Sequence, residues 1–188
     1  MSTALVVAHE IFGPDKHIQR MAEAVRHPEW TVSTPNFLPG NEVFPLEQEE
    51  RAYRRFTGEL GVVAMAEALA EHAAGLRTDH HRVLCLGFSV GATAAWLAAA
   101  AFDSIVCVYG SRIRDYTGHR PRCPCLLVFA EQEPGSTPGE VVGGLAGPTV
   151  AVELYEARHG FCNEDSPHHH AVHSASVVRS ARRFFHSG

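Results

Sequence analysis

The residues best suited to chemistry in this chain lie in the segment Gly87-Phe88-Ser89-Val90-Gly91. An apolar run, residues 82–86, precedes this G-x-S-x-G pattern, and an alanine-rich run, residues 92–101, follows it. A strand, a sharp turn and a helix in that order form a nucleophile elbow, which projects a serine hydroxyl above the edge of a sheet. The glycines relieve the crowding of the strained turn. A chance match in a small-residue turn is the alternative, and the flanking runs favour Ser89 as a nucleophile.

A serine hydroxyl is a poor nucleophile without a base, which is a histidine held by a carboxylate. In α/β-hydrolase sheets the chain order is serine, acid, histidine. His159 follows the last predicted strand in the segment Ala157-Arg158-His159-Gly160-Phe161, where such a base belongs. We therefore predict His159 as the base, against the alternative of an exposed loop histidine.

The acid is expected directly after the preceding strand, which the sequence predicts to end at Ala130. Glu131 and Glu133 both qualify. Glu133 is favoured because Pro134 fixes the turn that follows it, and Asp115 is a third possibility.

The loop after the first predicted strand reads His9-Glu10-Ile11-Phe12-Gly13. An oxyanion needs two preorganised amides, one of them from the residue after the nucleophile, which is Val90. We predict the second amide at Ile11. Glu10 then lies over the nucleophile, although a buried carboxylate that only ties down the loop is the alternative.

Short apolar runs alternate with helix-like segments along the chain. Predicted strands cover residues 4–8, 31–34, 83–87, 104–109, 126–130 and 149–154. Predicted helices cover residues 15–25, 46–56, 60–76, 92–101, 138–145 and 167–185. This alternation indicates about six mostly parallel strands with helices on both faces, and active sites in such sheets form at the carboxyl ends of the strands.

The chain has 188 residues, 45% of them apolar and 20% charged, which is typical of one soluble globular domain spanning residues 1–188. Its formal net charge of −5 argues against nucleic acid or an anionic membrane as a partner. Five cysteines without a C-x-x-C pair, and no run long enough to span a bilayer, favour the cytoplasm. A small-molecule substrate is expected, and the sequence makes no prediction of oligomeric state.

Four histidines near the carboxyl terminus, His168, His169, His170 and His173, raise the alternative of a metal site. No cysteine or carboxylate at convincing ligand spacing joins them, so a solvated helix face is favoured. We predict neither a metal nor an organic cofactor.

Several segments together resemble the dienelactone hydrolase family over nearly the whole chain, and the H-E-I-F-G segment is the most specific match. The segments are Ala8-His9-Glu10-Ile11-Phe12-Gly13, Pro35-Asn36-Phe37-Leu38, Glu50-Arg51-Ala52-Tyr53, Gly87-Phe88-Ser89-Val90-Gly91, Val108-Tyr109-Gly110, Ala130-Glu131-Gln132-Glu133 and Arg158-His159-Gly160-Phe161. The resemblance implies a compact α/β-hydrolase fold without the family's usual N-terminal hairpin. It implies a triad of Ser89, Glu133 and His159.

By the same resemblance, Glu10 matches a glutamate that contacts the resting nucleophile, and Ile11 and Val90 match the oxyanion amides. Three aromatic residues in the matching segments are expected near the substrate: Tyr53, Tyr109 and Phe161.

The chain departs from the resemblance at positions that matter for the substrate. The family's namesakes use cysteine and aspartate where this chain has Ser89 and Glu133. Their two arginines that bind a substrate carboxylate are matched here by Glu49 and Asn163. A carboxylate beside Glu49 would be repelled, so an anionic dienelactone is disfavoured unless Arg112, Arg114 or Arg158 substitutes from a neighbouring loop.

These residues predict a serine hydrolase that cleaves an ester, thioester or lactone through an acyl-enzyme. An acyltransferase or lyase with the same site is one alternative, because only the fate of the acyl group differs. A binding protein with a silent site is the other.

Overall fold

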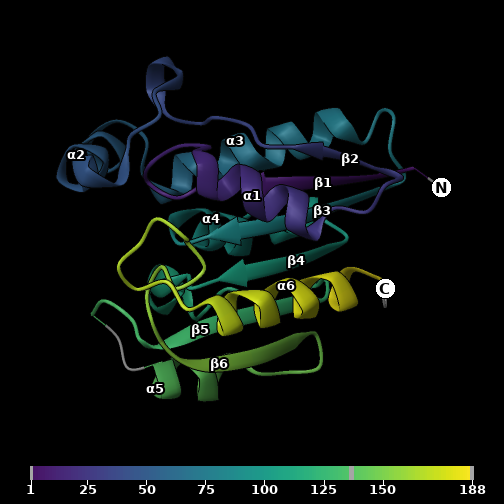
Figure 1. The fold of residues 1–188 in the computed structure, drawn as a ribbon. Coiled ribbons are helices and arrows are strands. Elements are labelled where there is room, and N and C mark those ends of the chain that lie inside the picture. Colours follow the sequence, from purple (N-terminus) through teal and green to yellow (C-terminus); the bar gives the residue numbers. More distant parts are fainter. Residues whose placement is uncertain (1, 136–137, 187–188) are drawn as a thin grey trace.

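A six-stranded sheet forms the centre of the molecule in a computed structural model, which describes residues 2–135 and 138–186 (Figure 1). The strand order is β2-β1-β3-β4-β5-β6, and every neighbouring pair is parallel. The strands are β1 (Thr3–Ala8), β2 (Trp30–Ser33), β3 (Arg82–Phe88), β4 (Ser104–Val108), β5 (Cys125–Gln132) and β6 (Val150–Arg158). The predicted α/β-hydrolase-like sheet of six parallel strands is confirmed.

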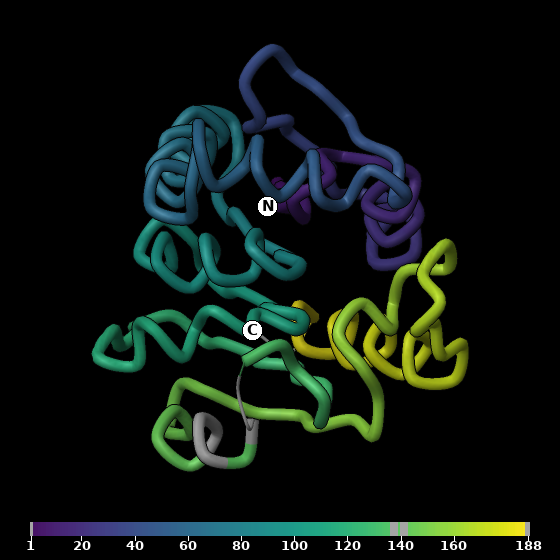
Figure 2. Tube along the Cα trace, turned by 90° about the vertical axis from the view of Figure 1, so that its left-hand side faces the viewer, coloured from purple at the N-terminus to yellow at the C-terminus, as the bar shows by residue number. Residues whose placement is uncertain are grey.

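Helices cover both faces of this sheet, as the alternation of the sequence predicts (Figure 2). Helices α1 (Lys16–Val25) and α6 (Ala171–His186) lie side by side on one face, and α3 (Gly61–Leu76) and α4 (Val90–Leu97) lie on the other. Helix α2 (Glu49–Glu59) lies beyond the carboxyl ends of the strands, and α5 (Pro138–Leu145) connects β5 with β6. Within the described residues none of the helices combines the length and the hydropathy that a bilayer crossing requires.

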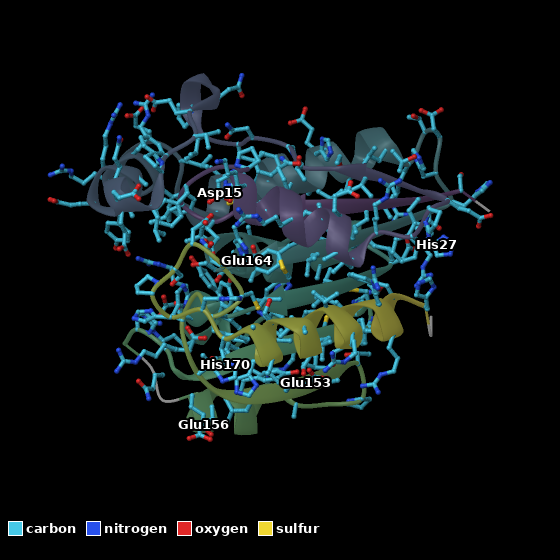
Figure 3. The ribbon with its side chains drawn as sticks, viewed as in Figure 1. Asp15, His27, Glu153, Glu156, Glu164 and His170 are labelled. Atoms are coloured by element: carbon cyan, nitrogen blue, oxygen red, sulfur yellow. The ribbon has the colours of Figure 1, made fainter. Side chains whose placement is uncertain are left out.

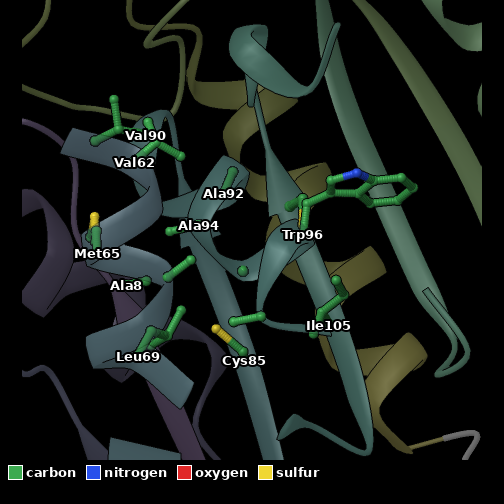
Figure 4. Close-up of a cluster of buried hydrophobic side chains, with 14 of the residues drawn as sticks. Ala8, Val62, Met65, Leu69, Cys85, Val90, Ala92, Ala94, Trp96 and Ile105 are labelled. Atoms are coloured by element: carbon green, nitrogen blue, oxygen red, sulfur yellow. The ribbon is translucent and has the colours of Figure 1, made fainter. Parts of the chain in front are cut away.

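The apolar core is divided in two by the sheet because successive strand side chains point to opposite faces. Val6 and Cys85 pack under α3 and α4, whereas Leu5 and Leu84 pack under α1 and α6. Figure 4 shows part of the cluster beneath α3 and α4. Full burial of one large aliphatic side chain contributes about 1.5–3 kcal/mol to stability. Packing on both faces of the sheet therefore fixes the positions of the strand ends, where the site forms.

Helix α1 illustrates how the sequence positions the site. The Asp15 carboxylate caps it by accepting a hydrogen bond of 3.0 Å from the backbone N–H of Ile18. Ile18, Met21 and Val25 recur at helical spacing and are buried against the sheet. His17 belongs to the same buried face, so a histidine points into the molecule at the end of the helix nearest the carboxyl ends of the strands.

The last helix begins later than predicted: α6 starts at Ala171, and Pro167 does not occupy its first turn. The preceding segment forms successive turns instead, and its end is tied back by a hydrogen bond of 3.0 Å from the His170 N–H to the Phe161 carbonyl. Helix α2 also begins later, because a short 3-10 turn, Leu46–Gln48, precedes it. Both exceptions lie at the carboxyl edge of the sheet, where loops must turn over the site.

Candidate active site

Ser89 lies at the sharp turn between β3 and α4. Its backbone has φ +51° and ψ −114°, a conformation that costs a non-glycine residue about 1–3 kcal/mol. Hydrogen bonds hold it on both sides: the Ser89 N–H donates to the Val108 carbonyl at 3.0 Å, and the Thr93 N–H donates to the Ser89 carbonyl at 3.2 Å. Backbone strain that is maintained by surrounding hydrogen bonds in this way is typical of turns at functional sites.

Two glycines make this turn possible. A Cβ atom on Gly87 would lie 2.5 Å from the Gly91 carbonyl oxygen. A Cβ atom on Gly91 would lie 2.5 Å from the carbonyl oxygens of both Ala8 and His9. These contacts are too close for any side chain, so the elbow packs backbone against backbone onto the end of β1.

His159 follows β6 and bridges the serine to a carboxylate. The Ser89 Oγ atom lies 3.0 Å from His159 Nε2, and His159 Nδ1 lies 2.5 Å from Glu133 Oε2. The other carboxylate oxygen, Glu133 Oε1, accepts a hydrogen bond of 3.0 Å from the Ala130 N–H. A carboxylate at Nδ1 places the proton on that nitrogen, which leaves Nε2 free to accept the proton of Ser89.

The charges around His159 prepare it to accept a proton. Burial by itself lowers the pKa of the imidazole, but the hydrogen bond and charge of Glu133 outweigh burial and raise the pKa above its usual 6.5. Glu10 and Glu49 add smaller contributions in the same direction. The edge-to-face contact of Tyr109 with the His159 ring, at 5.0 Å between centroids, keeps the ring in place.

Of the three candidate acids, Glu133 is the one that reaches His159. Its side chain is fully buried, whereas Glu131 and Asp115 are exposed. The sheet register shifts between Ala130 and Gln132, and the chain then folds back so that Glu133 caps the end of β5. This local reversal of the chain, rather than the alternation of side chains along a strand, buries Glu133 and leaves Glu131 exposed.

The loop after β1 is fixed by His9, a residue to which the sequence assigned no role. His9 Nδ1 donates to the Glu10 carbonyl at 2.6 Å, and His9 Nε2 accepts a hydrogen bond of 3.0 Å from the Phe37 N–H. Since a ring nitrogen that accepts from an N–H carries no proton, His9 is neutral. Burial lowers its pKa to about 4, which keeps it neutral near pH 7. The loop that carries Glu10 and Ile11 is therefore tied to the segment before α2.

Glu10 is a buried carboxyl group beside the serine and the histidine. Burial raises its pKa from 4.5 to about 7, against the opposing effects of the His159 charge and a hydrogen bond from the Tyr109 hydroxyl. The Tyr109 hydroxyl lies 3.1 Å from Nε2 of the buried His17. Glu10 is thus the first member of a buried polar row that runs from the site to helix α1.

A cavity of about 440 Å³ opens above these groups. Its floor includes Ser89, His159 and Glu10. The remaining lining comes from the loops at the carboxyl edge of the sheet: Ile11, Phe12, Leu46, Glu47, Glu49, Pro134, Gly160, Asn163, Ser166, Pro167 and His168. Its volume suits a small-molecule ligand.

Of the two predicted oxyanion residues, only Ile11 is among the described residues of the cavity lining, and Val90 directly follows Ser89. Val90 is the first residue of α4. The first N–H groups of a helix have no intrahelical acceptor, so the Val90 N–H is free to bind an oxygen at the site.

The three aromatic residues expected near the substrate lie outside the cavity lining. Tyr109 and Phe161 are fully buried and pack against each other at 5.7 Å between ring centroids. Tyr53 is on the surface of α2, and its hydroxyl accepts a hydrogen bond of 3.0 Å from Arg112. The structure therefore gives Tyr109 and Phe161 a packing role beneath the site and no contact with the cavity.

Glu49 and Asn163 line the cavity, as their match to the family's carboxylate-binding arginines implies. The arginines considered as substitutes do not line it. Arg112 contacts Tyr53, and Arg158 donates to the Gln132 side chain at 3.0 Å. Arg114 donates to the carbonyl oxygens of Ser111 and Pro134.

The histidines near the carboxyl terminus have separate surroundings. The rings of His170 and His173 stack at 3.8 Å between centroids, and His170 lies directly before the start of α6 (Figure 3). His168 lines the cavity, and its Nδ1 lies 3.3 Å from the His159 carbonyl oxygen. Within residues 2–135 and 138–186, no group of three or more His, Cys, Asp or Glu side chains could hold a metal ion.

Sequence reasoning missed several residues that shape the site. His9 and His17 carry a detectable signal, because one lies in the H-E-I-F-G segment and the other on the apolar face of a predicted helix. Glu47, Pro167 and His168 carry none, because loop conformation alone brings them to the cavity.

Comparison with known proteins supports the same fold. A model of the dienelactone hydrolase family matches residues 2–187. The uncharacterized protein YczH of Bacillus subtilis is 35% identical over 167 residues, which are 86% of this chain and 82% of that protein.

Solved structures show the same architecture at lower identity. One, from Klebsiella pneumoniae and provisionally named a dienelactone hydrolase, has a TM-score of 0.78 at 19% identity and covers 100% of this chain and 88% of its own. An esterase from Pyrococcus furiosus has a TM-score of 0.71 at 13% identity, and the match covers 99% of this chain and 82% of the esterase chain. The chain therefore belongs to the dienelactone hydrolase family and is a hydrolase of the α/β-hydrolase fold.

Proposed function

We propose that this protein is a serine hydrolase that cleaves an ester, thioester or lactone of a small molecule, without a metal or organic cofactor. One observation carries the proposal: Ser89, His159 and Glu133 form a continuous hydrogen-bonded row, and Ser89 and His159 line a cavity. The esterase among the structural relatives supports the choice of an acyl substrate.

In the proposed reaction His159 Nε2 takes the proton of Ser89 Oγ while that oxygen attacks the substrate carbonyl carbon. The backbone N–H groups of Ile11 and Val90 bind the oxyanion that results. His159 then gives its proton to the leaving oxygen or sulfur, and an acyl-enzyme remains. Water, deprotonated by His159, releases the acid and restores Ser89.

A phosphonate with a p-nitrophenyl leaving group tests this proposal, because a nucleophilic serine displaces p-nitrophenolate and stays covalently modified. We expect one equivalent of p-nitrophenolate per chain and a mass increase confined to the peptide that contains Ser89. A binding protein with a silent site would release none. An acyltransferase or lyase would be modified but would hydrolyse simple acyl esters slowly.

The substitution Glu10→Gln tests a supporting role for Glu10 beside the reacting groups. A serine hydroxyl is already neutral, so Glu10 is not needed to hold a proton on the nucleophile and contributes only by positioning it. We expect kcat for an acyl ester to fall about tenfold, well short of the loss of a triad member. A loss as deep as that of Ser89→Ala would make Glu10 an essential acid or base.

The same variant has a predicted effect on stability. Glu10 keeps its proton up to a pKa of about 7 in the folded protein, whereas its reference value is 4.5. Between these values the folded state binds more protons, so ionisation of Glu10 lowers the free energy of unfolding as pH rises, by up to about 3 kcal/mol. Denaturant unfolding at pH 5 and pH 8 should show that Glu10→Gln lacks this decline. Equal declines in both proteins would contradict the raised pKa.

A further inference from the structure

The mouth of the cavity carries negative charge that no lysine or arginine in the described part of its lining balances. Glu47 and Glu49 line the cavity and are exposed at its rim, one in the 3-10 turn before α2 and the other at the first position of that helix. Neither lysine nor arginine lines the cavity among the residues that the structure describes. Among the described residues, the other ionisable groups in the lining are Glu10 on the floor and two histidines, His159 and His168.

The charge at the rim acts on the reacting groups below it. Glu49 is one of the charges that raise the pKa of Glu10 and the pKa of His159. A carboxylate whose field reaches the floor of the cavity also acts on a charged ligand bound between the rim and the floor.

The arginines around the cavity do not cancel this field at its mouth. Arg114 donates to two backbone carbonyl oxygens, and Arg20 forms ion pairs with Glu164 and Asp165 at 3.5 and 3.1 Å. Arg51 pairs with Glu42 at 3.4 Å. Among the described residues, none of these three arginines lines the cavity, and none forms an ion pair with Glu47 or Glu49.

The charges, the cavity and the reactive serine together identify a class of substrate. We propose that the natural substrate is an acyl compound that carries an organic cation, an ammonium or quaternary ammonium group, held at the rim by Glu47 and Glu49 while its carbonyl lies over Ser89. Leu46 lines the same wall and offers apolar surface to the carbon atoms around the charge. This inference rests on the proposed serine hydrolase and names its substrate class.

Three phosphonates that differ in one substituent test the inference. All are p-nitrophenyl methylphosphonates, and the remaining alkoxy group is 2-trimethylammonioethyl, its uncharged isostere 3,3-dimethylbutyl, or a carboxyalkyl chain of similar length. In each, Ser89 Oγ bonds to phosphorus, p-nitrophenolate leaves with the bonding electron pair, and the serine proton passes to His159. The measurement is the second-order rate constant for modification of Ser89.

We expect the cationic probe to react at least about fivefold faster than its isostere at low salt, and the anionic probe to react more slowly than both. The cation preference should fall to less than about twofold in 0.5 M NaCl, because exposed charges are screened. The double variant Glu47→Gln/Glu49→Gln should bring the ratio of the first two rates to about one. Glu71→Gln removes an exposed carboxylate on α3, outside the cavity lining, and should leave the ratio unchanged.

The outcomes separate this inference from the proposed function. If the isostere modifies Ser89 and the cationic probe reacts no faster, the proposed cationic substrate class is wrong, whereas the proposed serine hydrolase activity is still supported. A preference that survives the double variant, or one that Glu71→Gln abolishes equally, also overturns the inference. If no probe modifies Ser89, the proposed function fails and the inference falls with it.

Discussion

The substitution Ser89→Ala is expected to lower kcat for any good acyl substrate by about 10⁴-fold or more. The hydroxyl that bonds to the substrate is lost, and neither His159 nor the oxyanion amides replace it. Steady-state kinetics with an acyl ester, beside the p-nitrophenolate release described above, measures the effect.

The fold should survive this change, because the backbone around the elbow is fixed by hydrogen bonds and by the glycines that flank it. The circular dichroism spectrum and the unfolding midpoint of Ser89→Ala should therefore match those of the wild-type protein. Near-normal turnover in a folded Ser89→Ala variant would refute the proposed mechanism.

Glu133→Gln is expected to cost about 10³- to 10⁴-fold in rate. Glutamine is close in shape to glutamate, but its amide can donate to His159 Nδ1 and so select the tautomer that carries the proton on Nε2. That nitrogen then cannot accept the proton of Ser89. The hydrogen bond and charge of Glu133 raise the pKa of His159, so the acid limb of the kcat/KM profile should also move to lower pH.

Glu131→Gln is the matched control, because it removes the same charge two residues earlier from an exposed side chain. The rate of this variant should stay within about threefold of the rate of the wild-type protein, as for a surface substitution away from the site. The opposite ranking of the two variants would move the acid role to Glu131.

The sequence was sufficient to predict the sheet and the elbow because both depend on local pattern. Apolar runs of strand length alternate with helical spacing, and the two glycines around Ser89 mark a turn that excludes side chains. In the structure β1 pairs with β3 in register from Thr3 with Arg82 to Ala8 with Gly87, so the loop after β1 lies next to the elbow.

Loop residues escaped prediction because their positions depend on how distant segments fold back. Pro167 looked like a helix start, yet the segment that contains it turns over the cavity and α6 begins at Ala171. Tyr109 and Phe161 stand in matching segments, but the direction of a side chain at a strand end is set by packing, which buries both. Glu47 reaches the rim only because a 3-10 turn precedes α2.

The long separation between the nucleophile and its base has a consequence during synthesis. Ser89 and His159 are 70 residues apart in the chain, and β6, which leads to His159, pairs at the edge of the sheet. A ribosome that adds about 5–20 residues per second needs roughly 4–14 seconds to extend the chain from one residue to the other. The elbow therefore leaves the ribosome well before His159, whose imidazole would activate Ser89. A nascent chain, or one truncated before His159, therefore holds a serine that has no base to accept its proton.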